Sequence, residues 1–79
     1  MLLSELKIGT FAHITGFAEG DKAYRHKLLS LGLTRGTTVF LERKAPLGDP
    51  LQIVVRGFSL SLRKEEARMI CVEVCAETN

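Results

Sequence analysis

Residues 37–62 read TTVFLERKAPLGDPLQIVVRGFSLSL, and this stretch decides the fold of the chain. Apolar and polar residues alternate along 37–43, 51–56 and 58–63. Successive side chains of a strand point to opposite faces, so this alternation predicts three half-buried strands. Two prolines, a glycine and an aspartate make 45–50 a compact turn, and Arg56-Gly57 is typical of a tight hairpin. The stretch therefore predicts a three-stranded antiparallel unit.

The same alternation appears on both sides of this unit. Residues 11–17 predict an earlier strand, and 69–75 predict a last strand with Ile70, Val72 and Val74 on one face. Residues 64–67 supply about one helical turn.

A helix is expected between Asp21, a suitable N-cap residue, and Gly32, a suitable terminator. Its predicted buried stripe is Tyr24, Leu28 and Leu31, and Leu29 lies beside it. We therefore expect a mainly β fold, a small barrel of about five strands with one α-helix inserted after the first. Closure of the barrel, full or nearly full, would remove exposed strand edges.

Length and composition limit what the chain can do. It has 79 residues, of which 46% are hydrophobic, and a net charge of +2. We expect one domain over residues 1–79 with a single core, because disordered chains are less hydrophobic. The mild charge and 6% aromatic content argue against nucleic-acid binding. No long apolar run or secretory signal is visible, which predicts a cytoplasmic protein that does not insert into a membrane.

Catalytic motifs are missing from the sequence. It contains no glycine-rich phosphate-binding motif and no nucleophile elbow. His13 and His26 are the only histidines, and no motif brings a serine or cysteine to either. We therefore predict that the chain is not an enzyme and needs no cofactor.

Cys71 and Cys75 leave a metal-site alternative open. On a regular strand their Cα atoms lie roughly 13 Å apart, which is too far for a disulfide. Both are expected on the face opposite Ile70 and Val72. A structural zinc site needs four ligands, so these cysteines would need His13 or His26 to converge on them. Ordinary free cysteines are the favoured interpretation, and metal binding or sensing through Cys71, Cys75 and a histidine is the alternative function.

The proline-rich turn at 45–50 is the most distinctive feature of the surface. Leu47 at its tip either packs back over the barrel mouth or forms a preorganised contact for another protein. Asp49 either binds backbone N–H groups in an Asx turn or contributes to such a contact.

Three blocks of the sequence together resemble the FeoA family. The family patterns are R-x-K/R-L-x-x-L-G-x-x-x-G, A-P-x-G-D-P and G-x-x-L-x-L-R-x-x-E-A. They match, respectively, Arg25 to Gly32 with Gly36, Ala45 to Pro50, and Gly57 to Ala67. The resemblance runs from about Tyr24 to Val72.

This resemblance implies an SH3-like barrel and a cytoplasmic accessory role in bacterial ferrous iron uptake. The implied partner is the membrane transporter FeoB, which carries a cytoplasmic GTP-binding domain; contact with it would bring the protein to the inner face of the membrane. The module is also similar to the C-terminal domain of DtxR-type repressors, but no winged-helix region precedes it here. The family pattern supplies no metal site.

We expect an adaptor that binds the transporter and supports or regulates transport. SH3-like barrels commonly bind partners through loops and adjacent surface. The residues predicted to bind the partner are Tyr24, Arg25, Leu28, Leu29, Arg35, Leu47 and Asp49. A further alternative is an activator of the transporter's GTPase that inserts Arg35 or Arg25 to stabilise charge on the transferred phosphoryl group.

Overall fold

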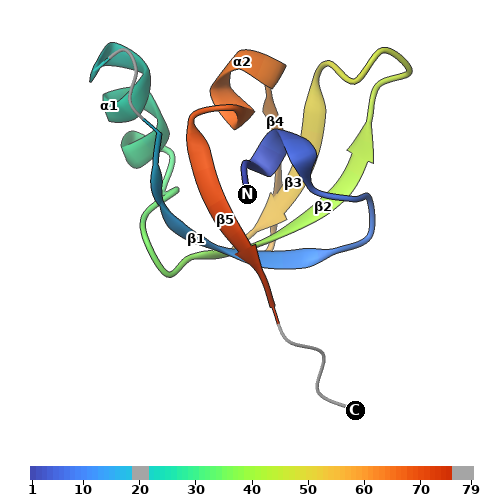
Figure 1. Cartoon of the computed structure of the whole chain (residues 1–79), viewed down its shortest axis with the longest axis horizontal. Coiled ribbons are helices and arrows are strands. Elements are labelled where there is room, and N and C mark those ends of the chain that lie inside the picture. Colours follow the sequence, from blue (N-terminus) through green and yellow to red (C-terminus); the bar gives the residue numbers. More distant parts are fainter. Residues whose placement is uncertain (19–21, 76–79) are drawn as a thin grey trace.

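The computed structural model describes residues 1–18 and 22–75 (Figure 1). In chain order its elements are the 3₁₀ turn η1 (Leu3–Glu5), β1 (Phe11–Phe17), α1 (Lys22–Ser30), β2 (Thr38–Lys44), β3 (Leu51–Val55), β4 (Phe58–Leu62), α2 (Lys64–Ala67) and β5 (Ile70–Val74). This order confirms the predicted mainly β chain, with its one long helix following the first strand.

All neighbouring strands of the sheet are antiparallel, in the order β4-β3-β2-β1-β5. The sheet curls around its core, and η1 lies near its open side (Figure 1). The N-terminus covers part of the outer edge of β5, because Leu2 bridges to Cys71 and the Val72 N–H donates to the Met1 carbonyl at 2.8 Å. This pairing covers part of the β5 edge, whereas no strand among the described residues pairs with the outer edge of β4, so the barrel is not closed by a β4–β5 pairing.

The core collects the inward residues of every strand. The predicted alternation is confirmed in β3, where Leu51, Ile53 and Val55 are buried, and in β2 at Val39 and Leu41. It ends at Arg43, which is exposed and follows a register shift after Leu41. In β5, Ile70 and Val72 are buried, whereas 47% of Val74, on the same predicted face, is exposed. Val74 is the last residue of β5.

The turn between β3 and β4 has the predicted hairpin form. Arg56 and Gly57 have φ angles of 51° and 85°, and Val55 pairs with Phe58. Two successive positive φ values are what a two-residue type I′ turn requires.

The end of α1 explains why the helix lies where it does. Gly32 has φ 87°, its N–H donates to the Leu29 carbonyl, and the Leu33 N–H donates to the Leu28 carbonyl at 3.1 Å. This is a Schellman ending, and Leu28 and Leu33 are both fully buried. The predicted end at Gly32 is confirmed, whereas the predicted N-cap, Asp21, lies outside the described residues.

The predicted buried stripe of α1 is only partly present. Leu28 is the buried residue of the helix and Leu31 is half-buried against the core. Tyr24, one turn before Leu28, is 37% exposed. The helix is anchored at its C-terminal end and rises away from the barrel at one side (Figure 1). The first turn of α1 therefore packs against less of the sheet than the last turn does, and Tyr24 stays partly exposed.

Candidate partner-binding surface

The β2–β3 loop holds Leu47 out from the barrel. Inside the loop, the Gly48 N–H donates to the Ala45 carbonyl at 2.7 Å, and the Ala45 N–H donates to the Pro50 carbonyl at 3.0 Å. Leu47 at the tip is 92% exposed. Of the two possibilities for this residue, packing back over the barrel mouth is therefore ruled out. The hydrogen bonds inside the loop hold its backbone, and this backbone presents Leu47 to solvent.

Asp49 ties this loop to α2. Its Oδ1 accepts a hydrogen bond at 3.0 Å from the backbone N–H of Lys64, the first residue of α2. A carboxylate is favoured there, because the first N–H groups of a helix lack partners within it. The expected Asx turn is thus replaced by a longer-range contact, and we assign Asp49 to bracing the loop.

The exposed part of α1 carries three of the predicted residues. The Arg25 guanidinium lies 5.7 Å from the centre of the Phe17 ring, in cation–π range. Tyr24 and Leu29 are each more than one-third exposed. Leu28 was expected on the same surface, but it is fully buried and cannot touch a partner while the helix is docked.

Arg35 lies beyond the end of α1, over the last part of β1. A Cβ at Gly16 would lie 3.7 Å from its Nη2, so the guanidinium lies in van der Waals range of Gly16. Arg25 and Arg35 thus rest over successive residues of β1, Phe17 and Gly16.

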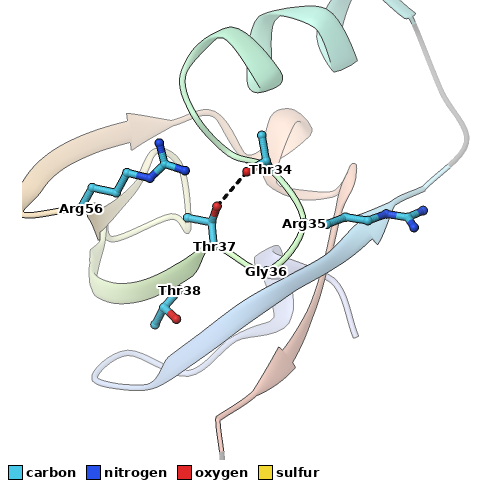
Figure 2. Close-up of a pocket in the computed structure, with 6 residues that line it drawn as sticks. All are labelled: Thr34, Arg35, Gly36, Thr37, Thr38 and Arg56. Atoms are coloured by element: carbon cyan, nitrogen blue, oxygen red, sulfur yellow. Dashed lines mark hydrogen bonds between the residues drawn. The ribbon is translucent and has the colours of Figure 1, made fainter.

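A shallow depression of about 500 Å³ adjoins Arg35 (Figure 2). Thr34, Arg35, Gly36, Thr37, Thr38 and Arg56 line it. The Thr34 and Thr37 hydroxyls form a hydrogen bond with each other, with their oxygens 3.1 Å apart. Figure 2 shows Arg56 on one side of the Thr34–Thr37 pair and Arg35 on the other, with the Arg35 side chain extending away along β1, so their charges do not converge on one anion. The depression does not have the geometry of a phosphate cradle.

Glu66 is a structural residue that sequence reasoning did not single out. Its Oε2 lies 2.9 Å from Lys27 Nζ of α1, and its Oε1 accepts the Arg63 N–H at 2.9 Å. Burial by itself raises the pKa of this carboxyl. The hydrogen bonds from Lys27 and Arg63, with the charges of both residues, outweigh burial and hold the pKa below its usual value. The glutamate of the third sequence block falls at Glu66, and this match was the signal in the sequence that could have identified the residue.

Both cysteines are free, as expected. Cys71 pairs with Gly16 across the strands, whereas the thiol of Cys75 lies beside His13. In residues 1–18 and 22–75, no three or more His, Cys, Asp or Glu side chains gather as metal ligands. The three-ligand site of Cys71, Cys75 and a histidine is therefore not formed.

The sequence profile of the FeoA domain matches residues 1–74 of the chain. The chain belongs to the FeoA family. FeoA domains are transport-associated accessory domains, and the five-stranded SH3-like fold agrees with this assignment.

A curated relative is the Fe(2+) transport protein A/Fe(2+) transporter FeoB fusion protein of Porphyromonas gingivalis. It is 38% identical over 74 residues, which are 94% of this FeoA chain and 9% of the fusion protein. The chain therefore spans a small part of that relative, in which a FeoA sequence and a FeoB sequence share one polypeptide.

Solved FeoA structures have the same fold. A FeoA-like protein from Clostridium acetobutylicum has a TM-score of 0.88 and 42% identity, with 100% of this chain and 91% of that chain covered. FeoA of Stenotrophomonas maltophilia, an SH3 domain protein solved in complex with zinc, has a TM-score of 0.80 and 32% identity, with 92% and 89% covered. A manganese-dependent transcriptional repressor shares the fold alone, with a TM-score of 0.86 at 13% identity over 94% of this chain and 36% of that one.

Proposed function

We propose that this FeoA chain is a non-enzymatic adaptor that binds the cytoplasmic GTP-binding part of a FeoB-type ferrous iron transporter and supports or regulates transport. The observation that carries the proposal is the fusion relative, in which a FeoA sequence is joined to FeoB. Joining two modules in one chain raises the effective concentration of each module near the other. Such a fusion is useful when the two modules act together.

The surface that we propose for this contact extends from α1 to the β2–β3 loop, which lie on opposite sides of α2 (Figure 1). Leu47 supplies an apolar anchor, and Tyr24, Arg25 and Leu29 supply an exposed side of the helix, with Arg35 at its end. Interfaces are enriched in tyrosine and arginine at their centres, and a rigid loop loses little entropy on binding. Asp49 contributes indirectly, by holding the loop against α2.

The proposal places the chain in the cytoplasm, at the inner face of the membrane through its partner. Among the residues that the structure describes, no helix is long and apolar enough to cross a membrane. Recruitment by the transporter rather than insertion would bring the chain to the membrane, and nucleic acid has no part in the proposal.

Binding to the isolated cytoplasmic domain of FeoB tests the proposal. We expect Leu47→Arg and Arg25→Glu to weaken binding at least tenfold. The first variant removes an apolar contact and the second reverses a charge, and either change should cost more than about 1.4 kcal/mol of binding free energy. Phe58→Arg is the matched control, since Phe58 is also an exposed apolar residue but lies at the opposite end of β3 from the loop. It should bind as the unchanged protein does.

The affinities are measured by calorimetry on variants whose folding is checked by circular dichroism. Wild-type affinity in both folded variants would remove the proposed surface. No binding by the unchanged protein would remove the adaptor function itself.

A further inference from the structure

His13 and Cys75 are brought together by the pairing of β1 and β5. His13 lies opposite Glu73 in this pairing, and the Cys75 N–H donates to the Phe11 carbonyl at 3.0 Å. Two residues beyond Glu73 on the same side, Cys75 places its Sγ 3.8 Å from His13 Nδ1. The core-facing neighbours of His13, Ala12 and Ile14, are buried, so the pair lies on the outer face of the sheet.

The separation of the two donor atoms fits one metal ion. With Zn–S near 2.3 Å and Zn–N near 2.0–2.1 Å, a tetrahedral angle places sulfur and nitrogen about 3.6 Å apart. The observed 3.8 Å lies within the tolerance expected of a coordination site, about 0.2 Å. Neither side chain has to change its place on the sheet to chelate an ion.

Glu73 lies on the other side of the imidazole. Its Oε2 is 4.0 Å from His13 Nε2, the nitrogen that faces away from the thiol. A ligating histidine commonly donates its second N–H to a carboxylate, which fixes the ring and the tautomer. The 4.0 Å separation is longer than a hydrogen bond, so the exposed Glu73 side chain would move about 1 Å closer to accept the Nε2–H when Nδ1 binds the metal.

We propose that Cys75 and His13 chelate one borderline divalent cation, Zn²⁺ in preference to Fe²⁺, and that Glu73 orients the imidazole. Thiolate and imidazole donors suit zinc, and affinities for such donors rise from Fe²⁺ to Zn²⁺. No third ligand joins the pair among the described residues, so the other coordination positions are open to water. The site is thus an exchangeable surface site, and it does not depend on the adaptor function.

Titration with Co²⁺, a spectroscopic substitute for Zn²⁺, tests this site on the full chain. Thiolate ligation of Co²⁺ gives a ligand-to-metal charge-transfer band in the near ultraviolet. We expect the band in the unchanged protein, its loss in Cys75→Ser and at least tenfold weaker binding in His13→Ala. Glu73→Gln should weaken binding about tenfold while keeping the band, as changes at an orienting carboxylate do. Zn²⁺ should abolish the band by competition at concentrations at which Fe²⁺ does not.

Cys71→Ser is the matched control, because it removes the other free thiol from the same strand. It should keep both the band and the affinity. A band that persists in Cys75→Ser, or that is lost in Cys71→Ser, would overturn the proposal, as would the absence of a band in the unchanged protein. Circular dichroism establishes that each variant is folded.

Discussion

Glu66 is buried where α2 meets α1, and donors reach both of its carboxylate oxygens. Lys27 Nζ lies 2.9 Å from Oε2, and the Arg63 N–H lies 2.9 Å from Oε1. The Lys27 side chain is itself mostly exposed, so the ion pair is only half desolvated. Such an ion pair stabilises the fold less than a fully buried pair does. Replacing Glu66, its buried member, also changes the hydrogen bond that the Arg63 N–H donates.

We predict that Glu66→Gln lowers the free energy of unfolding at pH 7 by about 1.5–3 kcal/mol, the range for hydrogen bonds to charged groups. The pKa of the folded carboxyl is lowered, so its contribution is present above the unfolded-state pKa, about 4.3, and is lost as the pH falls through the folded pKa. The difference between the variant and the unchanged protein should therefore shrink in acid. Urea unfolding at several pH values measures it.

Glu65→Gln is the control, because Glu65 is the exposed neighbour in the same turn. It should change the free energy of unfolding by less than about 0.5 kcal/mol. A Glu66→Gln deficit of equal size at all pH values would contradict the ionised role of Glu66.

The contact between the β2–β3 loop and α2 shows how two short elements stabilise each other. A helix of four residues has little stability of its own, because nucleation is costly. The Asp49 carboxylate supplies an acceptor to its first N–H, and in return the loop gains an attachment outside itself.

We predict that Asp49→Ala destabilises the chain by about 1 kcal/mol, the typical cost of losing a side-chain acceptor at a helix start. The loss should be local, so amide hydrogen exchange at Lys64 should accelerate while that of the core strands changes little. Leu47→Ala, in the same loop but 92% exposed, should leave both quantities unchanged. Unaltered exchange at Lys64 in Asp49→Ala would show that the contact does not hold α2.

The strands could be predicted because alternation is a local signal, and each strand of this sheet has one buried face. Val39, Leu41 and Ile53 follow it without exception. Tyr24 and Val74 do not, because burial at the end of an element depends on whether another element covers it. The partners of Asp49 and His13 lie 15 and 62 residues away, and such contacts are fixed by the fold rather than by spacing. Leu47 could be identified as a candidate from the loop sequence, but only the structure decided its exposure.

One core stabilises the whole molecule. The buried residues of all five strands, η1 and α1 form a single cluster. A chain of 79 residues has a total stability of roughly 4–12 kcal/mol at ordinary values per residue. A core substitution that leaves one large cavity therefore removes a considerable part of this stability. For this reason, an effect of a variant on partner binding has to be separated from its effect on folding.

Leu28 and Leu29 are neighbours on α1 that make this separation possible, because Leu28 is fully buried and Leu29 is 39% exposed. Leu28→Ala should cost about 2–5 kcal/mol, as buried leucine truncations do. At about 4–8 °C per kcal/mol for a domain of this size, its melting temperature should fall by about 8 °C or more. Leu29→Ala should cost less than about 1 kcal/mol.

Binding to the FeoB cytoplasmic domain should follow the opposite order. At a temperature where both variants are folded, Leu28→Ala should keep its affinity, whereas Leu29→Ala should lose about 1 kcal/mol or more of binding free energy, as a contact residue does. Calorimetric melting and binding titrations on the same samples compare the two. A folded Leu28→Ala protein that binds as weakly as Leu29→Ala would mean that α1 undocks to expose Leu28, and would return that residue to the partner surface.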